Sequence, residues 1–303
     1  MQMQKTKWGR RGAAAIALTA ACTIGLGIAT SAAAPRTDAV VHHGAVAVTN
    51  WSNTLATNTT GWCTYASGCD GIQSAGTYGT IDVVSHTFSN YGGYAPSVNG
   101  PIGQTNSYAR VTGSGDYSTG CLVAGVSDPG SENCSGPYTT FGNNSSATVF
   151  PAHGFTTSQK IYLSKSWADA NPGQVVDWDV ALNDNTASYL QDFIFNLCTT
   201  SAGGGGFYVS TSSNAGGCST GPAELLMSGW YTFTENFHPS AGDVAVTYSI
   251  TNSLGSNALP GQFPVTTNTG HLVAAVGGTA YGWLPDEDIL GLPIARTSLT
   301  VNS

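Results

Sequence analysis

The sequence predicts an all-β fold in which two antiparallel sheets form one sandwich domain. Two observations carry this prediction. Short runs of alternating apolar and polar residues recur along the chain, and turn-forming residues separate them at fairly even spacing. The composition agrees, because only 9% of the residues are charged while 39 glycines and many aromatic residues are present, as is typical of extracellular β proteins.

The first 33 residues have the pattern of a signal peptide. Four basic residues precede an apolar run over residues 12–30, and small residues around Ala33 offer a cleavage site. We therefore expect a secreted, extracellular protein with a flexible N-terminal arm over residues 34–43 and a single β-sandwich domain over residues 44–303. No later apolar run is long enough to span a bilayer.

The predicted leader also changes the charge balance. Its removal takes away four of the nine basic residues and none of the 17 acidic ones, which leaves a net formal charge of −12. A chain this acidic is a poor ligand for nucleic acid or for an anionic membrane surface. The sequence does not indicate the oligomeric state.

Six cysteines follow the leader, and they fall into three pairs of near neighbours. Their spacing lacks the close CxxC pairs or neighbouring histidines of a zinc site, so we expect disulfides, each worth about 2–3 kcal/mol in the chain-entropy model. Near-neighbour pairing is favoured, although the count alone leaves other connectivities open. The favoured pairs are Cys63–Cys69, Cys121–Cys134 and Cys198–Cys218.

Short strands are expected through the first half of the domain, each an alternating or β-branched run between turn residues. A long aromatic loop over residues 91–101 and a turn over residues 128–130 separate some of them, and a loop over residues 167–173 leads into the next element. The expected strands are 45–51, 80–88, 107–112, 121–126, 147–150 and 159–163.

The best-defined element is a β-hairpin over residues 175–197. Apolar and polar residues alternate in each half, and the Asn-Asp-Asn-Thr run at residues 183–186 supplies the turn. Because a slip of one residue moves every side chain to the other face, only pairings of an odd with an even position join the two apolar sets. Such a pairing places Asp192 on the face that carries Asp177 and Asp179, which lie roughly 6.5–7 Å apart along the strand.

Further strands are expected after the hairpin, over residues 207–209, 230–237, 243–250, 270–276 and 292–301, whereas residues 222–227 fit either a strand or a helical turn. Trp230 and Tyr231 are adjacent, so both faces of their strand carry a large side chain for burial. Three glycines permit close approach of the backbone beside bulky aromatic residues: Gly277, Gly278 and Gly282.

Three stretches carry a resemblance: 189–197 (YLQDFIFNL), 228–237 (SGWYTFTENF) and 276–299 (VGGTAYGWLPDEDILGLPIARTSL). Together they resemble secreted bacterial proteins with a concanavalin-like (laminin-G-like) jelly-roll sandwich. The likeness spans about the second half of the chain and rests on aromatic residues and glycines. It implies two curved sheets whose concave face often meets glycans, and it supplies no activity.

The three aspartates of the hairpin are the candidate catalytic residues. Asp177, Asp179 and Asp192 could act as an acid/base pair, bind calcium or hold sugar hydroxyls, and their spacing is compatible with either stereochemical course of glycoside hydrolysis. Sandwich glucanases and laminarinases carry a Glu-x-Asp-x-Glu strand, whereas residues 177–181 here read Asp-Trp-Asp-Val-Ala, without either glutamate. The alternative is a solvated outer face of the sheet.

Aromatic residues in predicted loops are the candidate carbohydrate-binding residues: Tyr91, Tyr94 and Trp283, with Trp62 and Tyr65 beside them. Asp286 and Asp288 are candidate calcium ligands, with a solvated turn as the alternative. Asp184 is assigned to turn chemistry. A lyase would need a basic residue with His and Tyr, for which the sequence offers Arg110, His153 and Tyr108.

We therefore expect a secreted protein that binds glycan or cell-wall polysaccharide on a concave sheet face, with calcium as the cofactor that the acidic groups suggest. One alternative is a polysaccharide-cleaving enzyme, a glycoside hydrolase or a lyase, that uses Asp177, Asp179 or Asp192. The other is a non-catalytic structural protein of the cell surface.

Overall fold

A computed structural model of the chain describes residues 45–63, 80–85, 107–112, 121–123, 126–128, 137–142, 147–199, 205–214, 223–225, 227–258, 266–284, 289 and 291–303. The chain divides into two compact units, Met1–His42 and His43–Ser303. The predicted signal peptide and N-terminal arm lie outside the described residues. All elements below belong to the second unit.

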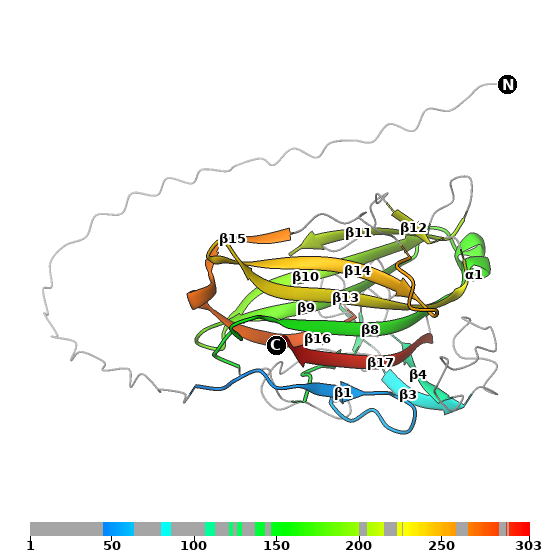
Figure 1. The fold of residues 1–303 in the computed structure, drawn as a ribbon. Helices are drawn as coiled ribbons and strands as arrows, with labels where there is room; N and C mark the ends of the chain where they lie inside the picture. The colour runs from blue at the N-terminus through cyan, green and yellow to red at the C-terminus, as the bar shows by residue number, and fades with distance from the viewer. Residues whose placement is uncertain are drawn as a thin grey trace, which may run out of the picture. The chain divides into compact units, whose positions relative to one another are not determined.

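The first of two large antiparallel sheets has eight strands, in the order β15-β14-β13-β8-β17-β4-β3 with β1 beside β17 (Figure 1). Long strands lie at its centre and short ones at its edges. Their bounds are β1 Trp51–Asn53, β3 Thr80–Ser85, β4 Ser107–Thr112, β8 Phe155–Leu163, β13 Gly229–Ser240, β14 Asp243–Asn252, β15 Thr266–Leu272 and β17 Leu292–Val301.

The second sheet has seven strands, in the order β12-β11-β10-β9-β16-β7-β2. Their bounds are β2 Trp62–Cys63, β7 Tyr138–Thr139, β9 Val175–Asp184, β10 Tyr189–Thr199, β11 Phe207–Ser213, β12 Ala223–Leu225 and β16 Val276–Trp283. A separate ribbon pairs β5 Cys121–Val123 with β6 Val126–Asp128, and two short helices, α1 Lys165–Ala170 and η2 Val273–Ala275, complete the described elements.

The two sheets share one apolar core, which confirms the predicted all-β sandwich. A single cluster of buried side chains includes residues of both sheets. Aromatic rings meet across the interface: Phe193 of β10 lies 5.5 Å from Phe237 of β13, and Phe195 lies 5.3 Å from Phe233. Buried aromatic area of this kind is the main apolar contribution to the stability of the sandwich.

A smaller cluster lies on the outer face of the eight-stranded sheet. Trp230 packs there against Tyr108 and Tyr162, with ring centroids 5.8 and 5.5 Å apart. Its neighbour Tyr231 belongs to the main core, and both side chains are 6% exposed. The prediction that both faces of this strand bury large side chains is confirmed.

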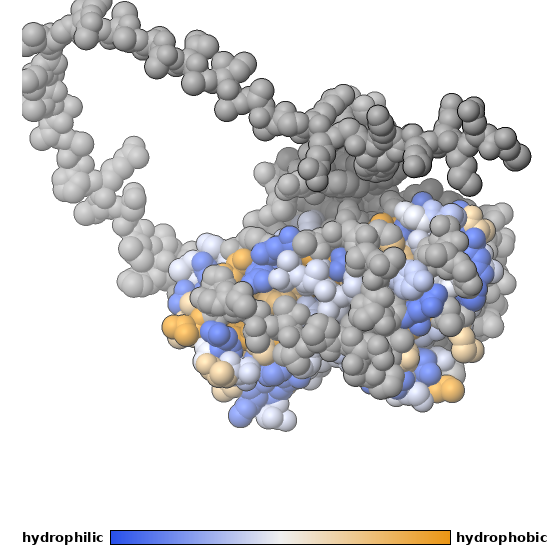
Figure 2. All heavy atoms as spheres, turned by 90° about the horizontal axis from the view of Figure 1, so that it is seen from above, coloured by the Kyte–Doolittle hydropathy of each residue, from blue (hydrophilic) through white to orange (hydrophobic). Residues whose placement is uncertain are grey.

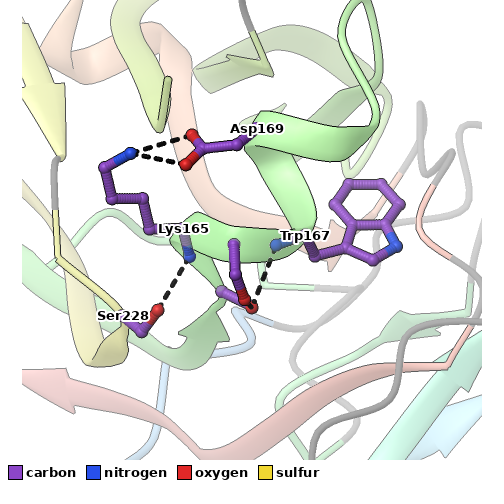
Figure 3. A network of polar contacts seen from close by, with 6 residues as sticks. Lys165, Trp167, Asp169 and Ser228 are labelled. Atoms are coloured by element: carbon purple, nitrogen blue, oxygen red, sulfur yellow. Dashed lines mark hydrogen bonds and ion pairs between the residues drawn. The ribbon is translucent and has the colours of Figure 1, made fainter. Parts of the chain in front are cut away.

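The loop predicted over residues 167–173 is wrong in its first part, because α1 covers Lys165–Ala170. The Ser164 hydroxyl caps this helix by accepting a hydrogen bond from the Trp167 N–H, and the Lys165 N–H donates to the Ser228 hydroxyl (Figure 3). An ion pair of 2.6 Å joins Lys165 to Asp169 one turn on. Six residues are too few to display helical periodicity, so only the capping serine signalled this helix.

The buried strand predicted over residues 270–276 is also wrong. β15 ends at Leu272, η2 follows, and β16 begins at Val276 in the other sheet. Leu272 is 63% exposed, so the apolar run marks a connection between sheets and not one strand. Residues 147–150 form only an isolated bridge between Ala47 and Val149, and within residues 222–227 the strand β12 covers Ala223–Leu225.

Gly282 confirms the predicted close backbone approach. A Cβ added there would lie 2.6 Å from Phe141 Cζ and 2.7 Å from Trp178 Cη2. At Gly278 it would lie 2.6 Å from Val48 Cγ2, and at Gly277 it would clash with the carbonyl oxygen of Asp184. These glycines let segments outside the sheets lie directly on β16.

The surface of the described residues is polar with scattered apolar side chains. The large exposed hydrophobic residues are far apart in sequence: Val46, Val149, Met227, Leu254 and Leu272. Hydrophilic residues predominate on the coloured surface in Figure 2. Within the same residues, no helix has the length and apolar character needed to cross a membrane.

Substituting Gly282→Ala should lower the free energy of unfolding by about 1–3 kcal/mol, because the added methyl group must displace Phe141 and Trp178 in a close-packed core. Urea unfolding followed by tryptophan fluorescence measures the change. Gly229→Ala in β13 is the matched control, since a Cβ there meets nothing within 4 Å, and its effect should stay within about 0.5 kcal/mol. Equal effects of the two substitutions would contradict the packing explanation.

Candidate functional site

Beyond a bulge near the turn, the hairpin of β9 and β10 pairs odd positions with even ones, as predicted. Trp178 pairs with Phe195, Asp179 with Ile194, and Ala181 with Asp192. Residues directly opposite each other in an antiparallel pair lie on the same face, and Trp178 and Phe195 belong to the core. Asp177, Asp179 and Asp192 therefore share the face of the seven-stranded sheet that points away from the core, and we call these three residues the acid cluster.

The acid cluster is not a solvated sheet face, so that alternative is wrong for two of its members. Asp177 is 0% exposed and Asp179 is 2% exposed, while Asp192 is half-buried. Alternation of polar and apolar residues along a strand gives the face of each side chain, but it does not say whether loops cover that face. The carboxyl groups of this cluster are therefore partly or fully removed from water, which disfavours their charged forms.

Asp179 lies at the centre of the cluster. The indole N–H of Trp283, which pairs with Asp179 across β9 and β16, donates to Asp179 Oδ2 at 3.0 Å. Burial raises the pKa of Asp179 well above its ordinary value of 3.8, and the carboxylates of Asp177, Asp192 and Glu235 raise it further, whereas the Trp283 hydrogen bond opposes the shift. Its surroundings thus favour the protonated form of this carboxyl more than water does.

The buried acceptor oxygens on this face include two, on Asp179 and Asn196, that have no hydrogen-bond partner among the described residues. One is Asp179 Oδ1. The other is Oδ1 of Asn196, a side chain that is 3% exposed, lies opposite Asp177, and donates from Nδ2 to the Ser212 hydroxyl at 2.9 Å. A buried acceptor without a donor costs about 1–3 kcal/mol, so a ligand that supplies hydroxyl donors would gain from meeting both.

Aromatic side chains adjoin the acid cluster on the same face. Tyr281 pairs with Ala181, and its ring lies 5.5 Å from that of Trp283 and 6.3 Å from that of Tyr138. Trp283 and Tyr281 are half-buried, which leaves part of each ring accessible. Trp283 was predicted in a loop and instead lies in the strand β16, where the strand fixes its direction toward Asp179.

The remaining predicted aromatic site is corrected or lies outside the described residues. Trp62 is in the strand β2, is 6% exposed, and packs 6.3 Å from Trp178 in the core, so its assignment to an exposed loop is wrong. Hydrophobic burial outweighs loop placement for a side chain of this size. Tyr65, Tyr91 and Tyr94 lie outside the described residues.

Asp184 has the predicted turn role. Its Oδ1 accepts hydrogen bonds from the backbone N–H groups of Thr186 and Ser188, at 2.8 and 3.0 Å, and from the Thr186 hydroxyl. Although slight burial pushes its pKa upward, these hydrogen bonds outweigh that effect and lower the pKa. Asp286 and Asp288 lie outside the described residues. Within the described part of the chain, no group of three His, Cys, Asp or Glu residues could hold a metal ion, so calcium stays a prediction.

Cys63 and Cys198 are disulfide-bonded. Their predicted partners, Cys69 and Cys218, lie outside the described residues, as do Cys134 and the side chain of Cys121. The three favoured pairings therefore stay predictions.

The three residues considered for a lyase do not come together. Tyr108 and Arg110 are buried side by side on β4, where Arg110 Nη2 donates to the Tyr108 hydroxyl at 3.3 Å. Ile294 of β17 pairs with Ala109 of β4 on one side and with Ile161 of β8 on the other, so Tyr108 and Arg110 lie beside the Ile161 position. His153 precedes the first residue of β8 by two positions. Phe155 and Ile161 are six positions apart on this extended strand, a distance of roughly 20 Å. The lyase constellation is wrong.

Glu235 is a buried carboxyl that the sequence analysis did not single out. It is 0% exposed and points into the core between Phe233 and Phe237 on β13, where Oε2 accepts from the Thr157 hydroxyl at 3.4 Å and Oε1 has no hydrogen-bond partner in the described part of the chain. Burial raises its pKa well above 4.5 and the Asp192 carboxylate adds to this, whereas the Thr157 hydrogen bond opposes it. Glu235 occupies one of the alternating positions 231, 233, 235 and 237, whose other members are aromatic, and this pattern in the sequence indicates that Glu235 faces the core.

Glu235→Gln should reduce the pH dependence of stability. Because the folded-state pKa lies above the unfolded value of 4.5, the stabilising protonation is complete below that value and is lost as pH rises through the raised pKa. The glutamine is neutral throughout, so the fall in unfolding free energy between about pH 4.5 and about pH 8 should shrink. Urea unfolding at both pH values measures this.

Glu224→Gln, at a half-buried glutamate on β12, is the control and should leave that fall unchanged. An unaltered pH dependence in Glu235→Gln would show that the core carboxyl is not held protonated.

No family model matches the chain, and no curated protein matches it. Among solved structures, the chain is similar to an endo-1,3-beta-glucanase from Streptomyces sioyaensis, with a TM-score of 0.30 and 16% sequence identity over 80% of this chain and 97% of that one. A likeness this weak carries no argument about activity. The sandwich is established by the sheet order and the shared core, and the concanavalin-like resemblance stays a prediction.

Proposed function

We propose that the protein is secreted, is stabilised by disulfides, and binds an extracellular polysaccharide on the acid-cluster face of the seven-stranded sheet. The observation that carries this proposal is the pair of buried acceptor oxygens, Asp179 Oδ1 and Asn196 Oδ1, beside the rings of Trp283 and Tyr281. Sugars supply hydroxyl donors for such acceptors and apolar C–H faces for such rings.

A neutral polysaccharide fits this face better than an anionic one. Three carboxyl groups lie together there, and an anionic ligand would add a further negative charge in a partly desolvated site. Asp192, Trp283 and Tyr281 keep part of their surface exposed, so a polymer that lies on the face meets these side chains first. Asp177, Asp179 and Asn196 then form the deeper, less accessible part of the site.

Glycoside hydrolysis is the second candidate, and the raised pKa of Asp179 favours it. A general acid must hold its proton near the working pH, and burial together with the neighbouring carboxylates raises the pKa of Asp179 in that direction. Asp192 is the diagonal neighbour of Asp179 across β9 and β10. Diagonal residues on neighbouring strands lie about 7–8 Å apart. That spacing suits an inverting mechanism, in which Asp179 protonates the leaving oxygen while Asp192 activates water.

Asp179→Asn should weaken polysaccharide binding by about tenfold or more, because the amide presents an N–H where the ligand needs an acceptor. A glycan array selects the ligand, calorimetry measures the affinity, and a reducing-sugar assay on the same glycan detects cleavage. Trp283→Phe removes the indole donor and should also weaken binding.

The same assays distinguish the two candidate functions. If the wild-type protein cleaves the glycan and Asp179→Asn lowers the cleavage rate at least about 100-fold, the protein is a glycoside hydrolase and not only a binding protein.

Asp243→Asn is the matched control, since it removes one half-buried carboxylate at the start of β14 in the other sheet. It should bind like the wild type. If all three variants bind alike, or if no glycan binds the wild type, the acid-cluster face is not a polysaccharide site and a purely structural role becomes the better explanation.

A further inference from the structure

The basic residues of this acidic protein are concentrated on one face. The described part of the chain contains four basic residues: Arg110, Lys160, Lys165 and Arg296. Lys165 lies on α1 and pairs with Asp169. The other three lie on β4, β8 and β17 of the eight-stranded sheet, on the side away from the core, which is the opposite side of the sandwich from the acid cluster.

A β-bulge places two of these residues side by side. Ile161 of β8 pairs with Ile294 of β17 and Gln159 pairs with Thr297, so Ala295 and Arg296 together oppose Lys160. In a two-against-one bulge of this kind the extra residue is displaced from the regular alternation, which turns the side chain of Arg296 toward the outer face. Neighbouring strands lie about 4.8 Å apart, so the two cations are close. Arg296 is exposed and Lys160 is half-buried.

Among the described residues, neither Lys160 nor Arg296 makes an ion pair or a side-chain hydrogen bond, whereas Lys165 pairs with Asp169. Burial lowers the pKa of Lys160, and the nearby Arg296 guanidinium lowers it further. Arg110, in contrast, is fully buried and donates to Gly291 O and to the Tyr108 hydroxyl, so its charge is already used within the fold.

Ten of the 17 acidic residues lie in the described part of the chain, and none of these ten forms an ion pair with Lys160 or Arg296. Two like charges held together without an acid cost free energy that an anion bound between them would recover. We propose that Lys160 and Arg296 form a second binding site, which holds the carboxylate groups of a uronic-acid polysaccharide lying across β8 and β17.

The chemistry of the neighbouring groups favours this ligand. The Arg296 guanidinium matches a planar carboxylate through two parallel hydrogen bonds, and the Lys160 ammonium adds a point charge. Tyr162 lies two residues from Lys160 on the same face of β8 and is half-buried, so its ring lies where a sugar ring beside the carboxylate would extend. The site is an exposed surface, which suits a repeating polymer better than one small enclosed ion.

Calorimetry with the full mature protein tests the proposal, with a short oligogalacturonate as the probe. The fully methyl-esterified oligomer is the matched neutral ligand, and it should bind at least about tenfold more weakly. The double variant Lys160→Gln/Arg296→Gln should lose at least about tenfold in affinity for the charged oligomer. Arg296→Gln alone, at an exposed position that does not endanger folding, should lose about threefold.

Lys165→Gln removes the same charge from α1 and should bind the charged oligomer like the wild type. Asp179→Asn should also bind the charged oligomer like the wild type, because the acid cluster lies on the other sheet. The polysaccharide proposal for the acid cluster can therefore fail while the proposal for Lys160 and Arg296 holds, and the reverse. The second site is excluded if the wild type does not bind oligogalacturonate, if both oligomers bind equally, or if Lys165→Gln weakens binding as much as the double variant. Displacement of the oligomer by an equal concentration of inorganic phosphate would also exclude it, as the mark of a simple anion site.

Discussion

The aromatic contact between the two sheets is the constraint on which the rest of the molecule depends. Phe193 and Phe195 on β10 meet Phe237 and Phe233 on β13, and Trp178 of β9 lies fully buried beside them. A one-residue slip of the strand pairing would turn all of these side chains outward and expose their apolar surface. The positions of the acids follow from this packing, because every residue between two core side chains must take the other face.

The protein tolerates costly burial of acidic groups on both sides of the seven-stranded sheet. Asp179 is almost completely buried on the outer side, and Glu235 is buried in the core. An isolated ionised carboxylate in such surroundings would be strongly destabilising, and a raised pKa is the usual escape. Structures keep such groups where a ligand or a reaction needs them, and the partner that Trp283 supplies to Asp179 suits that interpretation better than a packing accident.

The two proposed sites lie on opposite faces of the sandwich and differ in charge. The acid cluster would favour a neutral, hydroxyl-rich polymer, whereas the bulge at Arg296 gives the other sheet two neighbouring cations that pair with no acid in the described part of the chain. The net negative charge argues against general binding of polyanions. A local pair of cations does not conflict with that conclusion, because charges within a few ångströms of a ligand dominate over distant ones in screening salt.

The sequence by itself determined the all-β class, the hairpin of β9 and β10, its odd-even pairing and the common face of Asp177, Asp179 and Asp192. These features depend on the two-residue period of a strand and on local turn chemistry, both of which are visible along the chain. The tertiary structure decided what covers each face, and this changed the acids from a solvated surface to a buried cluster. It also decided that Trp62 lies in the core and that Trp283, from the strand β16, donates a hydrogen bond to Asp179. A bulge that no local pattern shows places Arg296 beside Lys160. Burial and inter-strand register arise from contacts between residues far apart in sequence, and no local pattern encodes them.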